Sequence, residues 1–241
     1  LRPCAGFVED LRLRKDPAEV RRLRRGAKIN REGLKVAAGF IRPGVCERDV
    51  AHVLEEAMRE EGATASAFDT IVASGPRGAM PHGIASGRKI RRGDMITIDF
   101  GAVVDGYHAD TTRVFSLGRP SAKAREICGI VLEAQRAAVA AVAPGIKCSE
   151  VDSAARRIIE NRGFGKAFGH GVGHGLGLDI HEGPRLGPDA TEVLRPGMVV
   201  TVEPGIYLPG WGGGRIEDMV LVTETGREVL TRSIPKELVV L

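Results

Sequence analysis

The chain has 241 residues, of which 43% are hydrophobic and 27% are charged, and its formal net charge is +4. This composition is typical of a globular domain and excludes collagen-like and disordered chains. No run of about 18 apolar residues and no signal-peptide pattern is present, so we expect no membrane association. The four cysteines are far apart and form no CxxC pair, which argues against a disulfide framework and favours a cytoplasmic protein.

The positive charge is concentrated at the N-terminal end, where residues 1–35 carry eleven Arg or Lys against five Asp or Glu. A basic stripe at Arg21, Arg22, Arg24 and Arg25 is one signal of nucleic-acid binding. No recognition motif accompanies the stripe, and the rest of the chain is not basic. A solvated helix face, or a surface that meets another domain, is therefore the preferred interpretation, and we expect no nucleic-acid partner.

Local signals predict both helices and strands along the chain. The segment DPAE at 16–19 begins a helix, with Asp as N-cap, Pro in the first turn and Glu closing a capping box. Ser121 begins a long Ala-rich helix, and Ser149 with Asp152 begins the next. The apolar runs 95–98 and 198–202 are short, rich in β-branched residues and bounded by glycine, so they predict buried strands.

Two passages of the sequence repeat at a spacing of about one hundred residues. Residues 40–63 and 141–164 each contain a Pro-Gly turn, continue with a helical apolar pattern and carry a glycine suited to a helix C-cap. Residues 93–101 (GDMITIDFG) and 197–205 (GMVVTVEPG) match at one constant offset. The order of the two repeats is the same, so we expect an internal duplication with a helix pair and β-structure in each half.

The first half contains two aspartates that a hairpin brings together. Asp105-Gly106 between apolar stretches is a strong signal for a two-residue turn. Pairing Val104 with Tyr107 makes Asp99 and Asp110 diagonal neighbours on one face, about 7–8 Å apart at Cα. Two carboxylates beside a buried strand are costly unless a cation lies between them.

The second half repeats this arrangement with glutamates. Glu203 occupies the position equivalent to Asp99, and Glu217 follows across a Gly-rich turn. Four carboxylates in symmetry-related places suit hard divalent ions, and two ions could share them. Solvated surface acids are the alternative, but Asp99 and Glu203 each follow a β-branched apolar run, which favours a metal site.

Residues 169–177 (GHGVGHGLG) have glycine at every second position, a pattern incompatible with a stable helix. In an extended chain, His170, Val172, His174 and Leu176 share one face, and the bare glycine face allows a neighbouring backbone to approach. Four residues of strand span roughly 13 Å, so one ion is not expected to bind both histidines. One metal ligand and one substrate-facing donor is the expected division.

Four further histidines differ in context. His82 precedes Asp99 by 17 residues and His181 precedes Glu203 by 22, so the duplication relates these two histidines if a short insertion is allowed. His52 lies in the middle of a predicted helix, and His108 lies near a turn. We expect no catalytic role for the last two.

Taken together, these residues resemble the metallo-aminopeptidases of the pita-bread fold, which include methionine aminopeptidase, aminopeptidase P, prolidase and creatinase. The resemblance extends from about Asp16 to Leu230. It implies an α+β fold in which two pseudo-twofold-related halves of helices pack on a curved antiparallel sheet. The implied organisation is a single catalytic domain, residues 1–241, with halves of about 16–117 and 120–230. The motifs that carry the resemblance are PHG at 81, TIDFGAVVDGYHADTTRVF at 97, GHGVGHGLGLDIHEGP at 169, TVEPGIY at 201 and GGRIEDMV at 213.

The resemblance also implies the roles of individual residues. Asp110 and Glu217 would bridge two divalent metal ions, Asp99 would bind the second ion, and His174 and Glu203 would complete the shell of the first. The implied catalytic residues are His82, His170, His181, Glu203 and Arg215. His82 would orient the substrate, and His170 and His181 would donate hydrogen bonds to the substrate or its scissile carbonyl. Glu203 would also move a proton to the leaving nitrogen, and Arg215 would hold either a ligand carboxylate or the substrate's C-terminus.

The motifs resemble the aminopeptidase P and prolidase branch. Methionine aminopeptidases typically place a His after the last glutamate, where this chain has Asp218. The expected activity is hydrolysis of the N-terminal Xaa-Pro bond of dipeptides or short peptides by a hydroxide that two metal ions activate. Methionine aminopeptidase activity and a peptide-binding module without catalysis are the alternatives.

The same resemblance gives expectations about cofactor, assembly and domain content. Mn²⁺ is the favoured metal because the ligands are rich in oxygen, and Zn²⁺, Co²⁺ and Fe²⁺ are alternatives. The proline-specific branch normally carries an extra N-terminal domain, which we expect to be absent from this chain. A homodimer is the expected assembly, and a short peptide is the expected partner.

Overall fold

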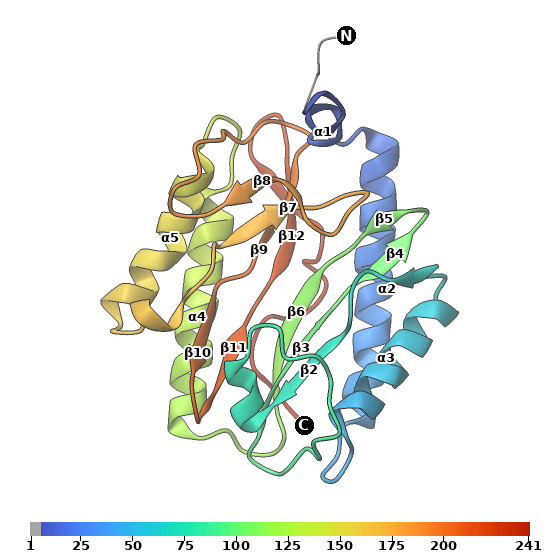
Figure 1. Cartoon of the computed structure of the whole chain (residues 1–241), viewed down its shortest axis with the longest axis vertical. Helices are drawn as coiled ribbons and strands as arrows, with labels where there is room; N and C mark the ends of the chain where they lie inside the picture. The colour runs from blue at the N-terminus through green and yellow to red at the C-terminus, as the bar shows by residue number, and fades with distance from the viewer. Residues whose placement is uncertain (1–5) are drawn as a thin grey trace.

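The computed structural model describes residues 6–241 and shows an α+β arrangement (Figure 1). The helices are α1 (Phe7–Arg12), α2 (Pro17–Phe40), α3 (Glu47–Glu60), α4 (Ala122–Ala141) and α5 (Cys148–Asn161), with short 3₁₀ turns η1 (Gly75–Ala79) and η2 (Gly165–Ala167). Among the residues described, no helix has both the length and the apolarity needed to cross a bilayer. Cys46, Cys128 and Cys148 are free thiols, and Cys4 lies outside the described residues.

The strands of the first half are β1 (Ala65–Ser66), β2 (Ile71–Ser74), β3 (Met95–Phe100), β4 (Ala102–Val104), β5 (Tyr107–His108) and β6 (Thr111–Ser116). Those of the second half are β7 (Gly173–Gly175), β8 (Glu182–Leu186), β9 (Val199–Val202), β10 (Gly205–Leu208), β11 (Gly212–Arg215), β12 (Asp218–Val222) and β13 (Arg227–Val229), followed by β14 (Val239–Val240).

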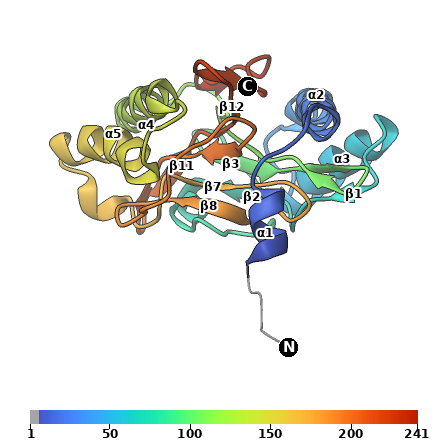
Figure 2. The same cartoon turned by 90° about the horizontal axis from the view of Figure 1, so that it is seen from above.

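The expected duplication is visible in the strand pairing. The central strand β3 lies between β2 and β6, and its counterpart β9 lies between β7 and β12, with every one of these pairs antiparallel. The isolated bridges Cys46–Lys89 and Lys147–Val193 also correspond in the two halves. The helix pair α2–α3 accompanies the first set of strands and α4–α5 the second, and Figure 2 shows α2 and α4 on the same face of the strands. These features confirm an α+β fold of two related halves.

The sheet differs from the expected one in two respects. Within residues 6–241 the strands form four hydrogen-bonded sheets, the largest with the orders β14-β6-β3-β2 and β13-β12-β9-β7-β8. The C-terminal strand β14 pairs with β6 in parallel, so the antiparallel expectation is wrong at this edge. A strand beyond residue 230 thus completes the sheet of the first half, because the chain crosses back after β13 and covers the free edge of β6.

The helix starts follow the predicted capping chemistry with one exception. Asp16 Oδ1 accepts hydrogen bonds from the backbone N–H of Ala18 and Glu19, and Glu19 Oε2 accepts from Asp16 N–H, which confirms the capping box. Ser121 caps α4 as predicted. The start of α5 was predicted wrongly: it begins at Cys148, and the carboxylate of Asp152 is buried and accepts from Val172 N–H instead of capping the helix.

Each helix pair buries one apolar face against its own sheet. In α3 the fully buried residues Val50 and Leu54 are four positions apart, and Val151 and Ala155 repeat this spacing in α5. Such a stripe is what a helix packed on a sheet requires. Each fully buried leucine contributes about 1.5–3 kcal/mol. One apolar cluster contains α3 and the β3 residues Ile96 and Ile98, another contains α5 and the β9 residues Val200 and Val202, and the candidate site is built at the ends of β3 and β9.

Gly101, between β3 and β4, is required by close backbone contact. A Cβ at this position would overlap the carbonyl oxygen of Ala109 on the opposing strand. We expect Gly101→Ala to lower the free energy of unfolding by about 1–3 kcal/mol, because the backbone of the hairpin must move to admit the methyl group. Gly129 lies within α4 with no atom near its virtual Cβ, so Gly129→Ala is a matched control that should stabilise the protein by about 0.5–1 kcal/mol. Urea denaturation of both variants measures the difference, and equal effects would contradict the steric argument.

Candidate active site

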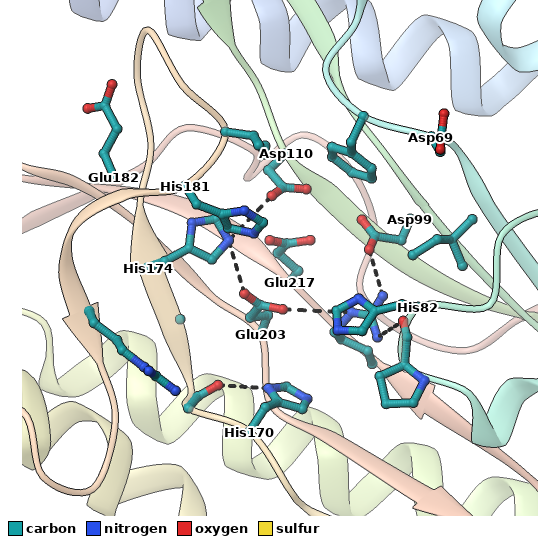
Figure 3. Close-up of a pocket in the computed structure, with 18 of the residues that line it drawn as sticks. Asp69, His82, Asp99, Asp110, His170, His174, His181, Glu182, Glu203 and Glu217 are labelled. Atoms are coloured by element: carbon teal, nitrogen blue, oxygen red, sulfur yellow. Dashed lines mark hydrogen bonds and ion pairs between the residues drawn. The ribbon is translucent and has the colours of Figure 1, made fainter.

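A cavity of about 650 Å³ contains all of the side chains that the sequence nominated (Figure 3). The first half contributes His82, Asp99 and Asp110, and the second half contributes His170, His174, His181, Glu203, Arg215 and Glu217. Residues that lie up to 135 positions apart in the chain therefore line one space. The remaining lining includes Phe68, Asp69 and Ile84, which the sequence did not single out.

The hairpin that carries the two aspartates has the predicted register. Val104 pairs with Tyr107 and Asp99 pairs with Thr112. The turn residues Asp105 and Gly106 have φ of 49° and 84°, the left-handed values that a two-residue hairpin turn demands. This register brings Asp99 and Asp110 into the same cavity.

The histidine-bearing segment is less regular than expected. Only Gly173–Gly175 forms a strand, and its register against β8 shifts after His174. His170 and His174 both line the cavity, whereas Val172 and Leu176 are buried in separate apolar clusters, so a single extended face from 170 to 176 is not observed.

The close backbone approach predicted for the glycines is confirmed. A Cβ on Gly171 would overlap the carbonyl oxygen of Leu186, and one on Gly173 would overlap that of Thr201. Glycine is therefore needed here because backbone, and not a ligand, fills the space beside it.

His174 is oriented with one ring nitrogen toward the carboxylates. Its Nδ1–H donates to the carbonyl oxygen of Gly175 over 3.0 Å, which leaves Nε2 at 3.3 Å from Glu203 Oε1 and 3.7 Å from Asp110 Oδ2. A neutral Nε2 lone pair facing carboxylate oxygens is repulsive unless a proton or a metal ion lies between them. Burial opposes protonation of His174, but the adjacent Glu203 carboxylate outweighs burial and raises the pKa of the imidazole.

Three buried carboxylate oxygens have no hydrogen-bond partner in the described residues. They are Asp99 Oδ1, Asp110 Oδ1 and Glu217 Oε1. Burial raises the pKa of Asp110 and of Glu217 well above the usual range, and the charges of neighbouring carboxylates raise both further. Ligand atoms of Asp110, His174 and Glu217 all lie within 4.8 Å of one another. Oxygen-rich donors that lack partners and repel one another fit bound divalent cations, because cations would satisfy the lone pairs and restore the ionised state.

Arg215 is 4% exposed and is surrounded by protein groups. Its Nη2 donates to Asp99 Oδ2 over 2.6 Å, its Nη1 donates to the hydroxyl oxygen of Tyr207 over 2.7 Å, and its Nε donates to Thr112 Oγ1 over 3.2 Å. Of the two roles that the sequence left open for Arg215, this geometry supports the holding of a ligand carboxylate. The guanidinium also prevents the Asp99 charge from being left unpaired in the buried site.

Tyr207 is a site residue that the sequence reasoning missed. The Nδ1–H of His170 donates to Gly171 O over 2.8 Å, so Nε2 accepts the hydrogen bond from the Tyr207 hydroxyl over 2.9 Å. In this arrangement His170 has no free N–H to donate to a substrate, unlike the role expected for it. Burial lowers the pKa of His170, which keeps the ring neutral. The available signal was position: Tyr207 lies in the TVEPGIY motif, four residues after Glu203.

We expect Tyr207→Phe to lower kcat/KM about tenfold, because loss of the hydroxyl leaves Arg215 and His170 each without a buried partner, at a cost of about 1–3 kcal/mol. Tyr107→Phe is the matched control, since the Tyr107 hydroxyl donates to Glu19 outside the cavity. Steady-state kinetics on Xaa-Pro substrates compare the two. A similar loss of activity in both variants would show that the hydrogen bonds of Tyr207 with Arg215 and His170 have no specific role in catalysis.

His82 and His181 differ from His170 in having free rings. Within residues 6–241 neither ring has a hydrogen-bond partner, and both line the cavity. The His181 ring packs edge-on against His174 with ring centroids 4.4 Å apart, and burial lowers its pKa, so it is neutral with one N–H available. The loop that carries His181 is fastened by the ion pairs Arg12–Asp179 and Lys15–Glu182, at 2.6 and 3.1 Å.

The two remaining histidines lie outside the cavity. His108 Nδ1 lies 3.4 Å from the carbonyl oxygen of Gly177, and His52 is exposed on α3. Neither contributes to the lining of the active-site cavity.

Comparison with known proteins identifies the family. Residues 21–224 match the description "Metallopeptidase family M24". An Xaa-Pro dipeptidase of Pyrococcus furiosus is 47% identical over 94% of this chain and 65% of its own length. Solved structures of an Xaa-Pro dipeptidase from Bacillus anthracis (51% identity, TM-score 0.97) and an X-Pro aminopeptidase from Thermotoga maritima (44% identity, TM-score 0.96) each match 99% of this chain and 67% of their own.

This chain thus spans about two thirds of the length of the relatives that it matches. The likeness extends over both halves of the structure, so it confirms the expected pita-bread fold. The family is one of metallopeptidases, which agrees with a site of unpartnered carboxylates and a histidine nitrogen suited to divalent metal ions. The chain belongs to metallopeptidase family M24.

Proposed function

We propose that this protein hydrolyses the N-terminal Xaa-Pro bond of dipeptides and short peptides, with two divalent metal ions held by Asp99, Asp110, His174, Glu203 and Glu217. The observation that carries this proposal is the group of buried carboxylate oxygens without partners, opposite the free Nε2 of His174. The printed activities of the relatives, Xaa-Pro dipeptidase and X-Pro aminopeptidase, support the substrate class. Mn²⁺ is the metal that we propose, because four of the five donors are carboxylates.

The bound ions would supply a water molecule of lowered pKa and polarise the scissile carbonyl. The chain's own groups do the rest. His82 and His181 have free rings beside the cavity and would each donate an N–H to the substrate's carbonyl oxygen, which stabilises the charge that develops there. Glu203 Oε1 faces His174 Nε2 and is placed to accept a proton and return it to the leaving proline nitrogen. Arg215 donates a hydrogen bond to Asp99 and keeps this carboxylate oriented.

A single set of assays tests the proposal. Hydrolysis of Xaa-Pro dipeptides and tripeptides with added Mn²⁺, and its loss with a chelator, is the expected result. At a metal concentration of 100 times Kd, Mn²⁺ should also stabilise the protein by about 2.7 kcal/mol in thermal denaturation. Absence of activity with every divalent ion would refute the proposed enzymatic activity. Peptide binding without turnover that survives Glu203→Ala would favour a binding module.

Peptides that begin with Met test the second candidate, methionine aminopeptidase. The residue after the last glutamate, Asp218, is fully buried and hydrogen-bonded to Arg113 and Thr231, so it lies outside the cavity. This observation disfavours that candidate, and cleavage of N-terminal Met alone would reverse the assignment.

Two further features remain proposals. We propose one catalytic domain with halves of about 16–117 and 120–230, and assembly as a homodimer. Light scattering coupled to size-exclusion chromatography measures the assembly, and a single unfolding transition would support one domain.

A further inference from the structure

A second cavity adjoins the active site along helix α3. Its volume is about 430 Å³, and it shares Phe68, Asp69 and Ile84 with the active-site cavity, so the two spaces meet at these three side chains. In the view of Figure 3, Asp69 lies at the edge of the active site, beyond Asp99 and away from His174. We call this second cavity the α3 groove. Its other lining residues are Arg48, Ala51, His52, Glu55, Arg59, Thr64, Ala65, Ser66, Thr70 and Ala85.

One wall of the α3 groove is a helix face that carries two arginines and a histidine. Arg48, His52 and Arg59 are exposed on this face, at positions i, i+4 and i+11. Within residues 6–241 the guanidinium of Arg48 has no hydrogen-bond or ion-pair partner. It packs over Gly87, where a Cβ would overlap Nη2. The acid on the same face, Glu55, accepts a hydrogen bond from the Thr70 hydroxyl over 2.7 Å and lies 3.9 Å from the guanidinium of Arg59.

The lining of the α3 groove also contains an edge strand, which can pair with extended backbone. This strand is β1, which lies at the end of its three-stranded sheet and pairs on one side with β4. Edge strands offer main-chain N–H and C=O groups to a bound peptide. The small side chains Ala51, Ala65 and Ala85 leave room in the groove.

The proposed reaction and the unpaired charge of Arg48 give a bound peptide a direction. The α3 groove is lined by two arginines and two carboxylates, but Arg59 lies 3.9 Å from Glu55, so Arg48 is the arginine of the groove without a carboxylate partner in residues 6–241. Because the proposed reaction removes the N-terminal residue, a productively bound peptide has its amine in the active site, and its C-terminal carboxylate can extend toward Arg48. Each residue of extended chain adds about 3.3–3.6 Å, so residues after proline would lead out past Phe68 and Ile84.

We propose that the α3 groove binds the residue that follows proline in substrates longer than a dipeptide, and that Arg48 binds its C-terminal carboxylate. This inference rests on the proposed Xaa-Pro hydrolysis and names the peptide length and the terminal group that the enzyme prefers. Guanidinium and carboxylate form paired hydrogen bonds. Because Arg48 is exposed and remote from the scissile bond, the pair should act on substrate binding and leave the chemical step unaltered.

The test compares three substrates: an Xaa-Pro dipeptide, the Xaa-Pro-Yaa tripeptide as free acid, and the same tripeptide as C-terminal amide. Arg48→Gln is compared with wild type and with Arg92→Gln, an exposed arginine outside both cavities that carries the same loss of charge. We expect Arg48→Gln to lower the ratio of tripeptide-acid to dipeptide kcat/KM about three- to fivefold through KM, the size typical of an exposed ion pair. The ratio for the amide should not change, and Arg92→Gln should change neither ratio.

The possible outcomes separate this inference from the proposed function. Hydrolysis of dipeptides without any hydrolysis of tripeptides would overturn the proposed role of the α3 groove in substrate binding. It would leave the proposed Xaa-Pro activity intact. Equal effects of Arg48→Gln on the acid and the amide would overturn carboxylate binding by Arg48. Failure to hydrolyse any Xaa-Pro peptide with Mn²⁺ would refute the proposed function itself.

Discussion

Glu217→Gln is expected to lower kcat/KM by at least about 10³, because the substitution removes a proposed bridging ligand and metal ions contribute several kcal/mol to such catalysis. Glu217 is 1% exposed, and its Oε2 accepts a hydrogen bond from the Thr112 hydroxyl over 2.7 Å while Oε1 has no partner. The amide keeps the shape and one acceptor of the side chain but loses the charge. The loss of activity should therefore come without loss of fold.

The same variant should be at least as stable as wild type when metal is absent. Burial and the charges of Glu203 and Asp99 raise the pKa of Glu217, so the ionised carboxylate is unfavourable in the metal-free site. Removing it relieves this repulsion, and the stabilisation by Mn²⁺ should shrink. Thermal denaturation with Mn²⁺ and with a chelator measures both effects, and the exposed Glu61→Gln is the control. Activity within tenfold of wild type would contradict the ligand role.

Asp218→Asn is expected to lower the free energy of unfolding by about 3–5 kcal/mol, because it removes one member of a buried charge network. The fully buried carboxylate accepts hydrogen bonds from Arg113, Gln135 and Thr231 at 2.7–2.9 Å, and Lys236 Nζ lies 2.9 Å from it. Arg113 is 2% exposed, so its charge would be left without a counterion. Urea denaturation measures the loss. The matched control is Glu237→Gln, whose exposed ion pair with Arg136 should contribute at most about 1 kcal/mol.

The effect of Asp218→Asn should also depend on pH. Burial would raise the pKa of Asp218, but the charges of Arg113 and Lys236 outweigh burial and lower it. A lowered pKa in the folded state means that the carboxylate stabilises the protein above the unfolded value of about 3.9 and loses this contribution as pH falls through the folded value. The difference between wild type and variant should therefore be constant from pH 7 to 5 and shrink below pH 4. A difference that grows on acidification would contradict this assignment.

Local sequence signals predicted those parts of the site that depend on short-range geometry. The Asp105-Gly106 turn predicts the hairpin register, and the register alone places Asp99 and Asp110 on one face. The repeated segments predict that Glu203 lies where Asp99 lies in the other half. The resemblance to a known family then supplied the proposed roles of the histidines and of Arg215. Neither a turn motif nor the spacing of apolar residues could have predicted these roles.

Features that depend on packing between distant segments could not be predicted. Tyr207 contacts Arg215 on the neighbouring strand β11 and also His170, which lies 37 residues away in a connection, and nothing in the local pattern of TVEPGIY predicts the contact with His170. The burial of Asp152 was missed for the same reason, since its backbone partner Val172 is 20 residues away. The parallel pairing of β14 depends on where the chain returns after β13.

The sequence by itself therefore determined the capping of α2 and α4, the hairpin, the duplication and the identity of the carboxylates, because each depends on residues close in the chain or on a repeated pattern. Only the tertiary structure decided which oxygens lack partners, which ring nitrogen of His174 faces the carboxylates, and that a groove lined by Arg48 adjoins the cavity. Desolvation and hydrogen-bond satisfaction depend on every neighbour in space, and most of those neighbours lie far away in the chain.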